Sequence, residues 1–269
     1  ILKRHKLKKM GFESDWLSYG RYLDLKKHLR KIKLIPKRNT IEDMRITKDP
    51  GEIELIKKSA AVAKRSFLYA KERLSPKCTG EKIAAIIDNR IRIYGGSGPA
   101  FETIVAQNPY SSQPHARATK SPIGRDAAVV IDMGAVYEGY NSDLTRCIFL
   151  GRITKKFKYI HNILITAQRR AIANVRPGTK ASRLDIIARQ YITKKGFGRY
   201  FLHGLGHGIG LEVHEGPRIS KGSNTILKPG MVFTVEPGIY IEGWGGLRIE
   251  DIIAVTENGC EVLTDDIPK

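Results

Sequence analysis

Apolar residues in the first third of the chain recur at steps of three and four, the spacing of one face of an α-helix. Between residues 48 and 74 this apolar face consists of Ile53, Ile56, Ala60, Ala63 and Phe67. A second helix is expected over residues 80–96, where the apolar pattern ends at two consecutive glycines that favour helix termination. The pattern therefore predicts a helix pair.

A similar helix pair is expected over residues 157–175 and 181–196. The second helices of the two pairs align at a shift of 101 residues, since Pro76 matches Pro177 and Gly95 matches Gly196. Apolar residues match at the same shift: Ile83 with Leu184, Ile86 with Ile187, and Ile91 with Ile192. This repeat suggests two similar halves with a site between them.

Strand-like sequence follows each helix pair. Runs of β-branched and apolar residues predict a hairpin over 126–150, turning at Tyr137–Tyr140, and another over 231–256, turning near Gly243–Gly246. Helices combined with a mostly antiparallel sheet define an α+β protein. Residues 21–39 differ, and they predict one short helix followed by a strand that ends at Pro36.

Charge is the unusual feature of the composition. The 269 residues include 47 Lys and Arg against 27 Asp and Glu, a net charge of +20. Such a surface can attract nucleic acid, but the bases are scattered and no nucleic-acid-binding motif accompanies them, so that function is not expected. The sequence contains no run of 18 apolar residues, so no membrane-spanning helix is predicted. The three cysteines are far apart, which favours a reducing cytoplasm.

Acidic residues interrupt the apolar strands of the first hairpin. Asp132 follows one apolar run, and Asp143 precedes the next. A two-residue turn at 137–138 would place the two side chains directly opposite each other, and a turn one residue later would make them diagonal neighbours on the same face. Two carboxylates that close either share a proton or bind a cation.

The second hairpin repeats this arrangement with Glu236 and Glu250, whose numbers are centred on residue 243. A loop of odd length there sets the two acids opposite each other. Arg248 lies two residues before Glu250, so both side chains leave the same face of the strand.

Three of the seven histidines lie close together in a glycine-rich stretch, residues 201–215. His203, His207 and His214 are alternative partners for the four acids. Four carboxylates and one imidazole form a ligand set for two metal ions, with carboxylates that bridge them.

Four segments together resemble the metallopeptidases of the pita-bread fold, which include methionine aminopeptidase, aminopeptidase P, prolidase and creatinase. These segments are GLGHGIGLEVHEGP, VVIDMGAVYEGYNSDLTR, LKPGMVFTVEPGIY and GGLRIEDIIAVTENGCEVLT. The resemblance, to family M24, covers residues from about 40 to 265. It implies two pseudo-symmetric halves around a curved antiparallel sheet, and a catalytic domain over 46–269. Residues 1–45 would be the remnant of a creatinase-like N-terminal domain and its linker.

The resemblance also implies a full set of site residues. The metal ligands would be Asp132, Asp143, His207, Glu236 and Glu250. Glu236 would also accept a proton from the attacking water, His214 would stabilise the oxyanion, His115 and His203 would hold the substrate, and Arg248 would fix a ligand carboxylate. The expected cofactor is two divalent ions. The hard ligands favour Mn²⁺, with Co²⁺ or Zn²⁺ as substitutes.

Residues 98–117 and 245–251 resemble the proline-specific branch, which implies an Xaa-Pro aminopeptidase or an Xaa-Pro dipeptidase. The implied substrate is a peptide or dipeptide with proline in second position, and a homodimer would fit the family. Three alternatives stay open: a methionine aminopeptidase, a creatinase-like hydrolase, and a non-enzymatic basic binding module on the same fold.

Overall fold

The computed structural model describes residues 7–269. These divide into two compact units, of which the first ends at Arg45 and the second is Ile46–Lys269. In the first unit strands β1 (Lys9–Glu13) and β2 (Lys33–Lys37) pair in parallel, joined by helix α1 (Tyr19–His28). Helix α2 (Thr40–Arg45) follows. The predicted helix and strand are therefore present. Strand β1, whose five residues alternate between exposed and half-buried positions, was not predicted.

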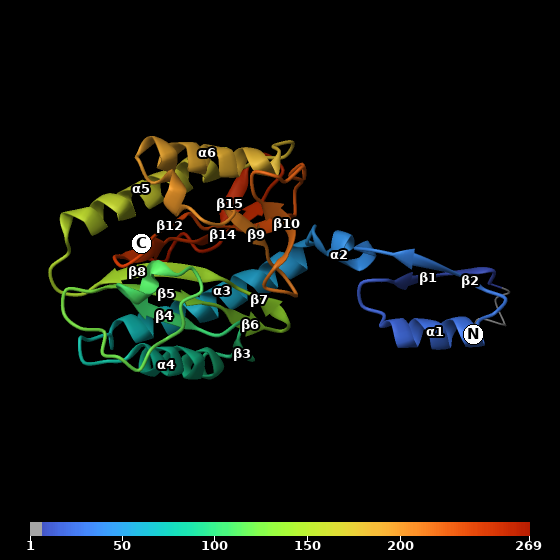
Figure 1. Cartoon of the computed structure of the whole chain (residues 1–269), viewed down its shortest axis with the longest axis horizontal. Coiled ribbons are helices and arrows are strands. Elements are labelled where there is room, and N and C mark those ends of the chain that lie inside the picture. Colours follow the sequence, from blue (N-terminus) through green and yellow to red (C-terminus); the bar gives the residue numbers. More distant parts are fainter. Residues whose placement is uncertain (1–6) are drawn as a thin grey trace. The chain divides into compact units, whose positions relative to one another are not determined.

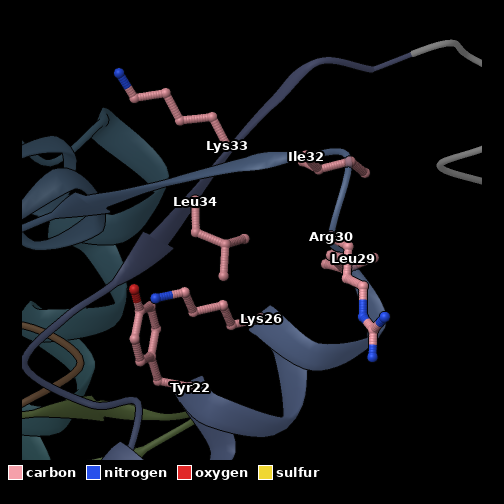
Figure 2. A pocket seen from close by; sticks show the side chains of 7 residues that line it. All are labelled: Tyr22, Lys26, Leu29, Arg30, Ile32, Lys33 and Leu34. Atoms are coloured by element: carbon pink, nitrogen blue, oxygen red, sulfur yellow. The ribbon is translucent and has the colours of Figure 1, made fainter.

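The first unit has little core, since none of the residues of α1 is buried. A cavity of about 350 Å³ lies between α1 and the start of β2 (Figure 2). Apolar and basic side chains line it together: Tyr22, Lys26, Leu29, Arg30, Ile32, Lys33 and Leu34.

The second unit contains the two helix pairs that the sequence predicts. Their bounds are Pro50–Lys71 for α3, Gly80–Ile93 for α4, Lys155–Ile172 for α5 and Ala181–Lys194 for α6. Helix α3 begins at a capping box, in which Asp49 and Glu52 each accept a hydrogen bond from the other's backbone N–H. Both ends of α6 lie 101 residues after those of α4, so the repeat seen in the sequence is a repeat of structure.

Antiparallel strands lie between the helix pairs (Figure 1). The first half has two sheets, ordered β4-β5-β8 and β3-β6-β7. Their strands are β3 (Gly98–Pro99), β4 (Ile104–Gln107), β5 (Ala128–Met133), β6 (Ala135–Tyr137), β7 (Tyr140–Asn141) and β8 (Leu144–Phe149).

The second half also has two sheets, ordered β10-β9-β11-β14-β15 and β12-β13. Their strands are β9 (Gly206–Gly208), β10 (Glu215–Ile219), β11 (Val232–Val235), β12 (Gly238–Ile241), β13 (Gly245–Arg248), β14 (Asp251–Val255) and β15 (Cys260–Val262).

Each helix pair packs much of its apolar face on the sheets of its own half. Phe67 and Ile87 of the first pair belong to one buried cluster with Ile131, whereas Leu164 belongs to another with Phe233. Buried clusters also cross between the halves, because Ile56 of α3 belongs to a third cluster with Ile252 of β14. The strands between the helix pairs carry the site. Among the described residues, no helix combines the length and the apolar composition needed to cross a bilayer.

Each predicted hairpin is divided into two ladders that belong to different sheets. The first changes sheet at Gly134, where a Cβ would lie 2.0 Å from the backbone oxygen of Ser142, so only glycine fits. The second changes sheet around Glu236 and Glu250, which lie between its two ladders. The breaks free backbone groups for bonds between the halves, as where Glu250 N donates to the carbonyl of Thr145 (3.2 Å).

Candidate metal centre

The first hairpin holds its two acids as diagonal neighbours. Its turn is at residues 138–139, because Tyr137 pairs with Tyr140, and this register places Asp132 opposite Thr145. Asp143 lies two residues before Thr145, so it follows the second of the two predicted registers. Both aspartates are buried.

The second hairpin holds its acids opposite each other. Gly238 pairs with Arg248 on one side, and Val235 pairs with Asp251 on the other, so Glu236 and Glu250 face each other between the two ladders. The three-residue loop after Ile241 has the odd length that the prediction required.

His207 faces this group of acids from strand β9. Its Nδ1 lies 3.1 Å from the carbonyl oxygen of Gly208 and must donate there, because a carbonyl only accepts. Burial lowers the pKa of His207 to about 4, so near neutral pH Nε2 carries a lone pair. This atom lies 3.6 Å from Asp143 Oδ2 and 3.4 Å from Glu236 Oε1.

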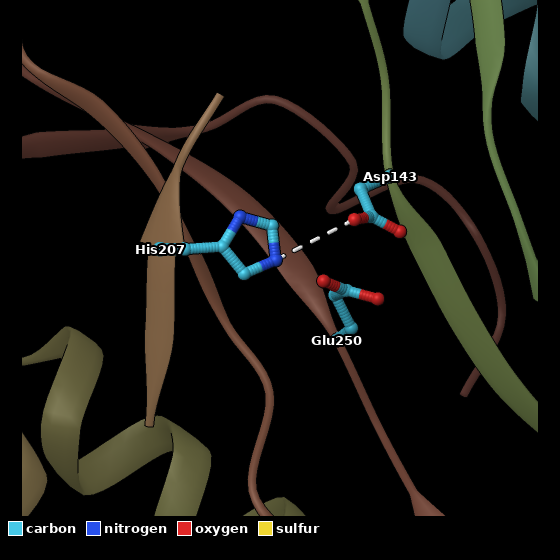
Figure 3. Close-up of side chains that lie close together, drawn as sticks. All are labelled: Asp143, His207 and Glu250. Atoms are coloured by element: carbon cyan, nitrogen blue, oxygen red, sulfur yellow. Dashed lines mark ion pairs between the residues drawn. The ribbon is translucent and has the colours of Figure 1, made fainter. Parts of the chain in front are cut away.

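Three donor atoms, one each from Asp143, His207 and Glu250, lie within 4.8 Å of one another (Figure 3). The three side chains come from different segments of the chain and converge on one point. Asp132 joins them through Thr145, whose Oγ1 lies 2.9 Å from Asp132 Oδ1 and 2.7 Å from Glu250 Oε2. The structure thus brings all five predicted ligands into one contiguous cluster.

The donor set fits divalent cations. Burial, and then repulsion from the neighbouring acids, raises the pKa of Asp143 and of Glu236 well above their usual values and that of Glu250 to about 7. The His207 lone pair points at two carboxylate oxygens, an arrangement that is repulsive unless a proton or a cation lies between them. Carboxylate oxygens and one imidazole are ligands that Mn²⁺ accepts readily.

Arg248 ties the cluster to a second histidine. Its guanidinium pairs with Asp132 and donates to Thr145 Oγ1 (3.0 Å) and to the Tyr240 hydroxyl (2.6 Å). Burial raises the pKa of Tyr240 to about 12, so its hydroxyl keeps its proton and can donate to His203 Nε2 at 3.1 Å. Arg248 therefore contacts a predicted ligand directly and His203 through Tyr240.

The other two predicted histidines lie at the edge of the cluster. The ring of His214 meets that of His207 edge-on, with centroids 4.2 Å apart. Burial lowers the pKa of His214, and the nearby charge of His115 lowers it further. His115 is exposed, in the turn after the short helix Tyr110–Ser112. His115 lies close enough to His203 and His214 for its charge to lower the pKa of both.

Sequence reasoning missed Thr145 and Tyr240. A signal for Thr145 was available, because it lies two residues after Asp143 on the same strand face. For Tyr240 the only signal was its position four residues after Glu236, an even spacing that places both side chains on one strand face. Both became recognisable once the register was known.

Comparison with known proteins identifies the family. The pattern of metallopeptidase family M24 matches residues 54–257, three quarters of the chain. The chain belongs to this family. The resemblance to family M24 that the sequence motifs indicated is thus confirmed. Residues 1–47 match a second family, the creatinase/prolidase N-terminal domain.

The M24 relatives are similar over nearly the whole chain. An Xaa-Pro dipeptidase of Pyrococcus horikoshii is 43% identical over 260 residues, which are 96% of this chain and 73% of the relative. The structure of an Xaa-Pro dipeptidase from Bacillus anthracis has a TM-score of 0.96 at 40% identity, covering 100% of this chain and 75% of that one. The structure of an X-Pro aminopeptidase from Thermotoga maritima has a TM-score of 0.93 at 40% identity, covering 98% of this chain and 75% of that one. The predicted α+β pita-bread fold is confirmed.

Proposed function

We propose that this M24 protein is a metal-dependent exopeptidase that hydrolyses the bond between an N-terminal residue and a following proline. The convergence of four acids and the His207 lone pair on one buried point carries this proposal. The Xaa-Pro peptidases among its relatives support proline in the second position. An Xaa-Pro bond has no N–H, so the site must recognise it through other groups.

Two divalent cations, Mn²⁺ in this proposal, would be held by Asp132, Asp143, His207, Glu236 and Glu250. When bound, such ions supply Lewis-acid activation of the attacking water and of the scissile carbonyl. The hydrogen bond from His207 Nδ1 to the Gly208 carbonyl presents Nε2 in the tautomer that a metal ligand needs.

The remaining roles belong to the protein's own side chains. Glu236, whose pKa burial raises, would accept the proton of the attacking water on its carboxylate. His214 would donate a hydrogen bond to the developing oxyanion, and His203 and His115 would hold the substrate. Arg248 would keep the Asp132 carboxylate in place, because it pairs with that carboxylate directly.

The deciding experiment combines metal analysis with turnover. Ala-Pro dipeptide and a longer Xaa-Pro peptide are compared with and without added Mn²⁺. We expect bound metal, and hydrolysis that a chelator abolishes and Mn²⁺ restores. The ratio of the two rates distinguishes a dipeptidase from an aminopeptidase. A metal-loaded protein that cleaves neither peptide would contradict the proposal.

Parallel assays address the other functions considered. Met-Ala tests for a methionine aminopeptidase, creatine tests for a creatinase-like hydrolase, and salt-sensitive binding to nucleic acid tests for a basic binding module. We expect all three responses to be weak beside the hydrolysis of Xaa-Pro substrates.

Three further proposals concern the whole protein. The match of residues 1–47 supports the interpretation of the first unit as part of a creatinase-like N-terminal domain, followed by the catalytic domain over 46–269. The cysteines are free, which supports a reducing cytoplasmic location. A homodimer is proposed from the family resemblance, and light scattering of the purified protein tests it.

A further inference from the structure

Lys48 and Glu215 form a buried ion pair beside the proposed site. Lys48 Nζ lies 2.6 Å from Glu215 Oε1, and the two side chains are only 2% and 5% exposed. Lys48 directly precedes Asp49, which caps α3, whereas Glu215 directly follows His214 and begins β10. The pair therefore joins the start of the second unit to the segment that carries His214.

The burial of this pair needs an explanation. Removing two charges from water is costly, so a buried ion pair is a weaker source of stability than two apolar side chains of similar size. What such a pair supplies is a fixed geometry. Lys48 is held firmly, because its backbone N–H donates to the Gly230 carbonyl (2.8 Å) and Nζ also contacts the Ile46 carbonyl (3.3 Å).

Glu215 closes the loop formed by residues 209–215. Its Oε2 accepts from the backbone N–H of Glu212 (3.3 Å), and Gly210 N donates to the Glu212 carbonyl (3.1 Å). Lys48 and Glu215 pack directly on Gly210, where a Cβ would lie 2.7 Å from Glu215 Oε1 and 2.9 Å from Lys48 Cε. The ion pair thus packs against the loop at Gly210.

Asn141 holds the loop from the other side. The Gly210 carbonyl accepts from Asn141 N (2.8 Å) and from Asn141 Nδ2 (3.0 Å), and Asn141 lies two residues before Asp143. The loop is therefore fixed both to the strand segment that carries one proposed ligand and, through Glu215, to Lys48. His214 lies at its end, with its ring 4.2 Å from that of His207.

From these contacts we infer that Lys48 is a positioning residue for catalysis, which acts through Glu215 to fix the loop 209–215 and the His214 ring. The inference rests on the proposed function, because it assigns His214 the task of stabilising the oxyanion. Lys48 pairs with Glu215 and is none of the five proposed ligands, so its loss should affect turnover without affecting metal loading.

The test is Lys48→Met in the full chain, assayed on Ala-Pro dipeptide with Mn²⁺. We expect kcat to fall roughly 100-fold, as for a misplaced catalytic group, with KM changed much less, because the lost interaction forms in the transition state. Metal content per chain should equal that of the wild type. Hydrogen exchange, followed by mass spectrometry without substrate, should accelerate in peptides covering residues 209–216.

Lys57→Met is the matched control. Lys57 pairs with Glu261 at 2.7 Å, but the two side chains are 35% and 51% exposed, so this variant should match the wild type in kcat and in exchange. Wild-type kcat in Lys48→Met, or faster exchange throughout the chain instead of in 209–216, would overturn the inference.

Two more variants keep the inference testable if Lys48→Met folds poorly. Glu215→Gln preserves the shape of the side chain, and it should show the same loss of kcat and the same local exchange. Lys48→Met combined with Glu215→Leu removes both charges, so its melting temperature should return toward the wild-type value while kcat stays low. Recovery of kcat in this double variant would show that burial alone, not the ion pair, positions the loop. Because exchange is measured without substrate, failure of the proposed peptidase activity is distinguishable from failure of this inference.

Discussion

The candidate centre holds more buried carboxylates than the neighbouring cations and hydrogen-bond donors can neutralise. Asp143, Glu236 and Glu250 have raised pKa values because burial and mutual repulsion both favour their protonated forms. Thr145 has one hydroxyl proton for two carboxylates, so it cannot satisfy both of them. Cation binding would relieve both effects.

Replacing Asp143 with Ala should abolish metal loading and peptidase activity together, because one carboxylate of the cluster is removed. The measurements are metal content after gel filtration and turnover of Ala-Pro dipeptide. Asp126→Ala, which alters a residue of the turn before β5, is a control for the loss of an acid and should keep its metal. Full activity in Asp143→Ala would refute the metal centre.

The pH dependence of stability should differ with and without metal. Raised carboxylate pKa values mean that the folded protein binds more protons than the unfolded chain, so stability falls as pH rises. His203 and His207, with pKa values lowered from 6.5 to about 4, act in the opposite direction, but only between those two values.

Above pH 6.5 only the carboxylate effect of these groups remains. In a chelator, urea denaturation should therefore show stability decreasing from pH 6.5 to about 8. Glu250→Gln should reduce this decrease, and added Mn²⁺ should reverse it, since metal binding strengthens as the ligands lose protons. Stability that rises over this range in a chelator would contradict the assignment of the carboxylate pKa values.

At the scale of elements, the close approach of strands positions the ligands. Strand β9 is only three residues long, yet it lies between β10 and β11 in the five-stranded sheet. Glycines on either side of His207 allow the backbones of the neighbouring strands to approach β9 closely. A Cβ at Gly206 would lie 1.9 Å from the Thr234 carbonyl oxygen, and one at Gly208 would lie 1.9 Å from that of Gly216.

Gly208→Ala should therefore force β9 and β10 apart and displace His207. We expect a loss of roughly 1–3 kcal/mol in the free energy of unfolding and a fall in kcat/KM of roughly 100-fold. Gly222→Ala is the matched control, because a Cβ there meets no atom within 4 Å. Equal stability and activity in the two variants would show that the strands can separate without consequence.

At the scale of the molecule, one buried arginine joins the C-terminal segment to the site. Arg146 is 1% exposed; it donates to Asp251 Oδ1 (2.8 Å) and pairs with the backbone carbonyl of Glu250. The same guanidinium donates to the carbonyls of Thr264 (3.2 Å) and Ile267 (3.1 Å). It therefore fixes a candidate ligand and the end of the chain together.

Arg146→Met should cost about 3–5 kcal/mol of stability, because it leaves Asp251 as a buried charge without this partner. Urea denaturation measures the loss, and proteolysis should cut the segment after Thr264 sooner than in the wild type. Arg117→Met should cost little, since Arg117 is 83% exposed and its distance to Glu102 is 3.8 Å. A small loss in Arg146→Met would show that the other contacts of the C-terminal segment, such as the ion pair between Lys269 and Asp251, hold it without Arg146.

The sequence by itself determined the helices, the two-half organisation, the α+β class and the identity of the clustered residues. These follow from local patterns: apolar spacing in α3 to α6, the 101-residue repeat, and acids placed inside apolar strands. It left the register of the first hairpin open between two alternatives, because either turn keeps Asp132 and Asp143 on one face.

The tertiary structure decided that register, and it decided where each hairpin leaves one sheet for the next. It also placed Thr145 and Tyr240 beside the ligands, and it formed the ion pair between Lys48 and Glu215, which lie 167 residues apart in the sequence. Such contacts depend on how the two halves meet. Local spacing carries no information about that meeting, since it is set by the shape and burial of both cores.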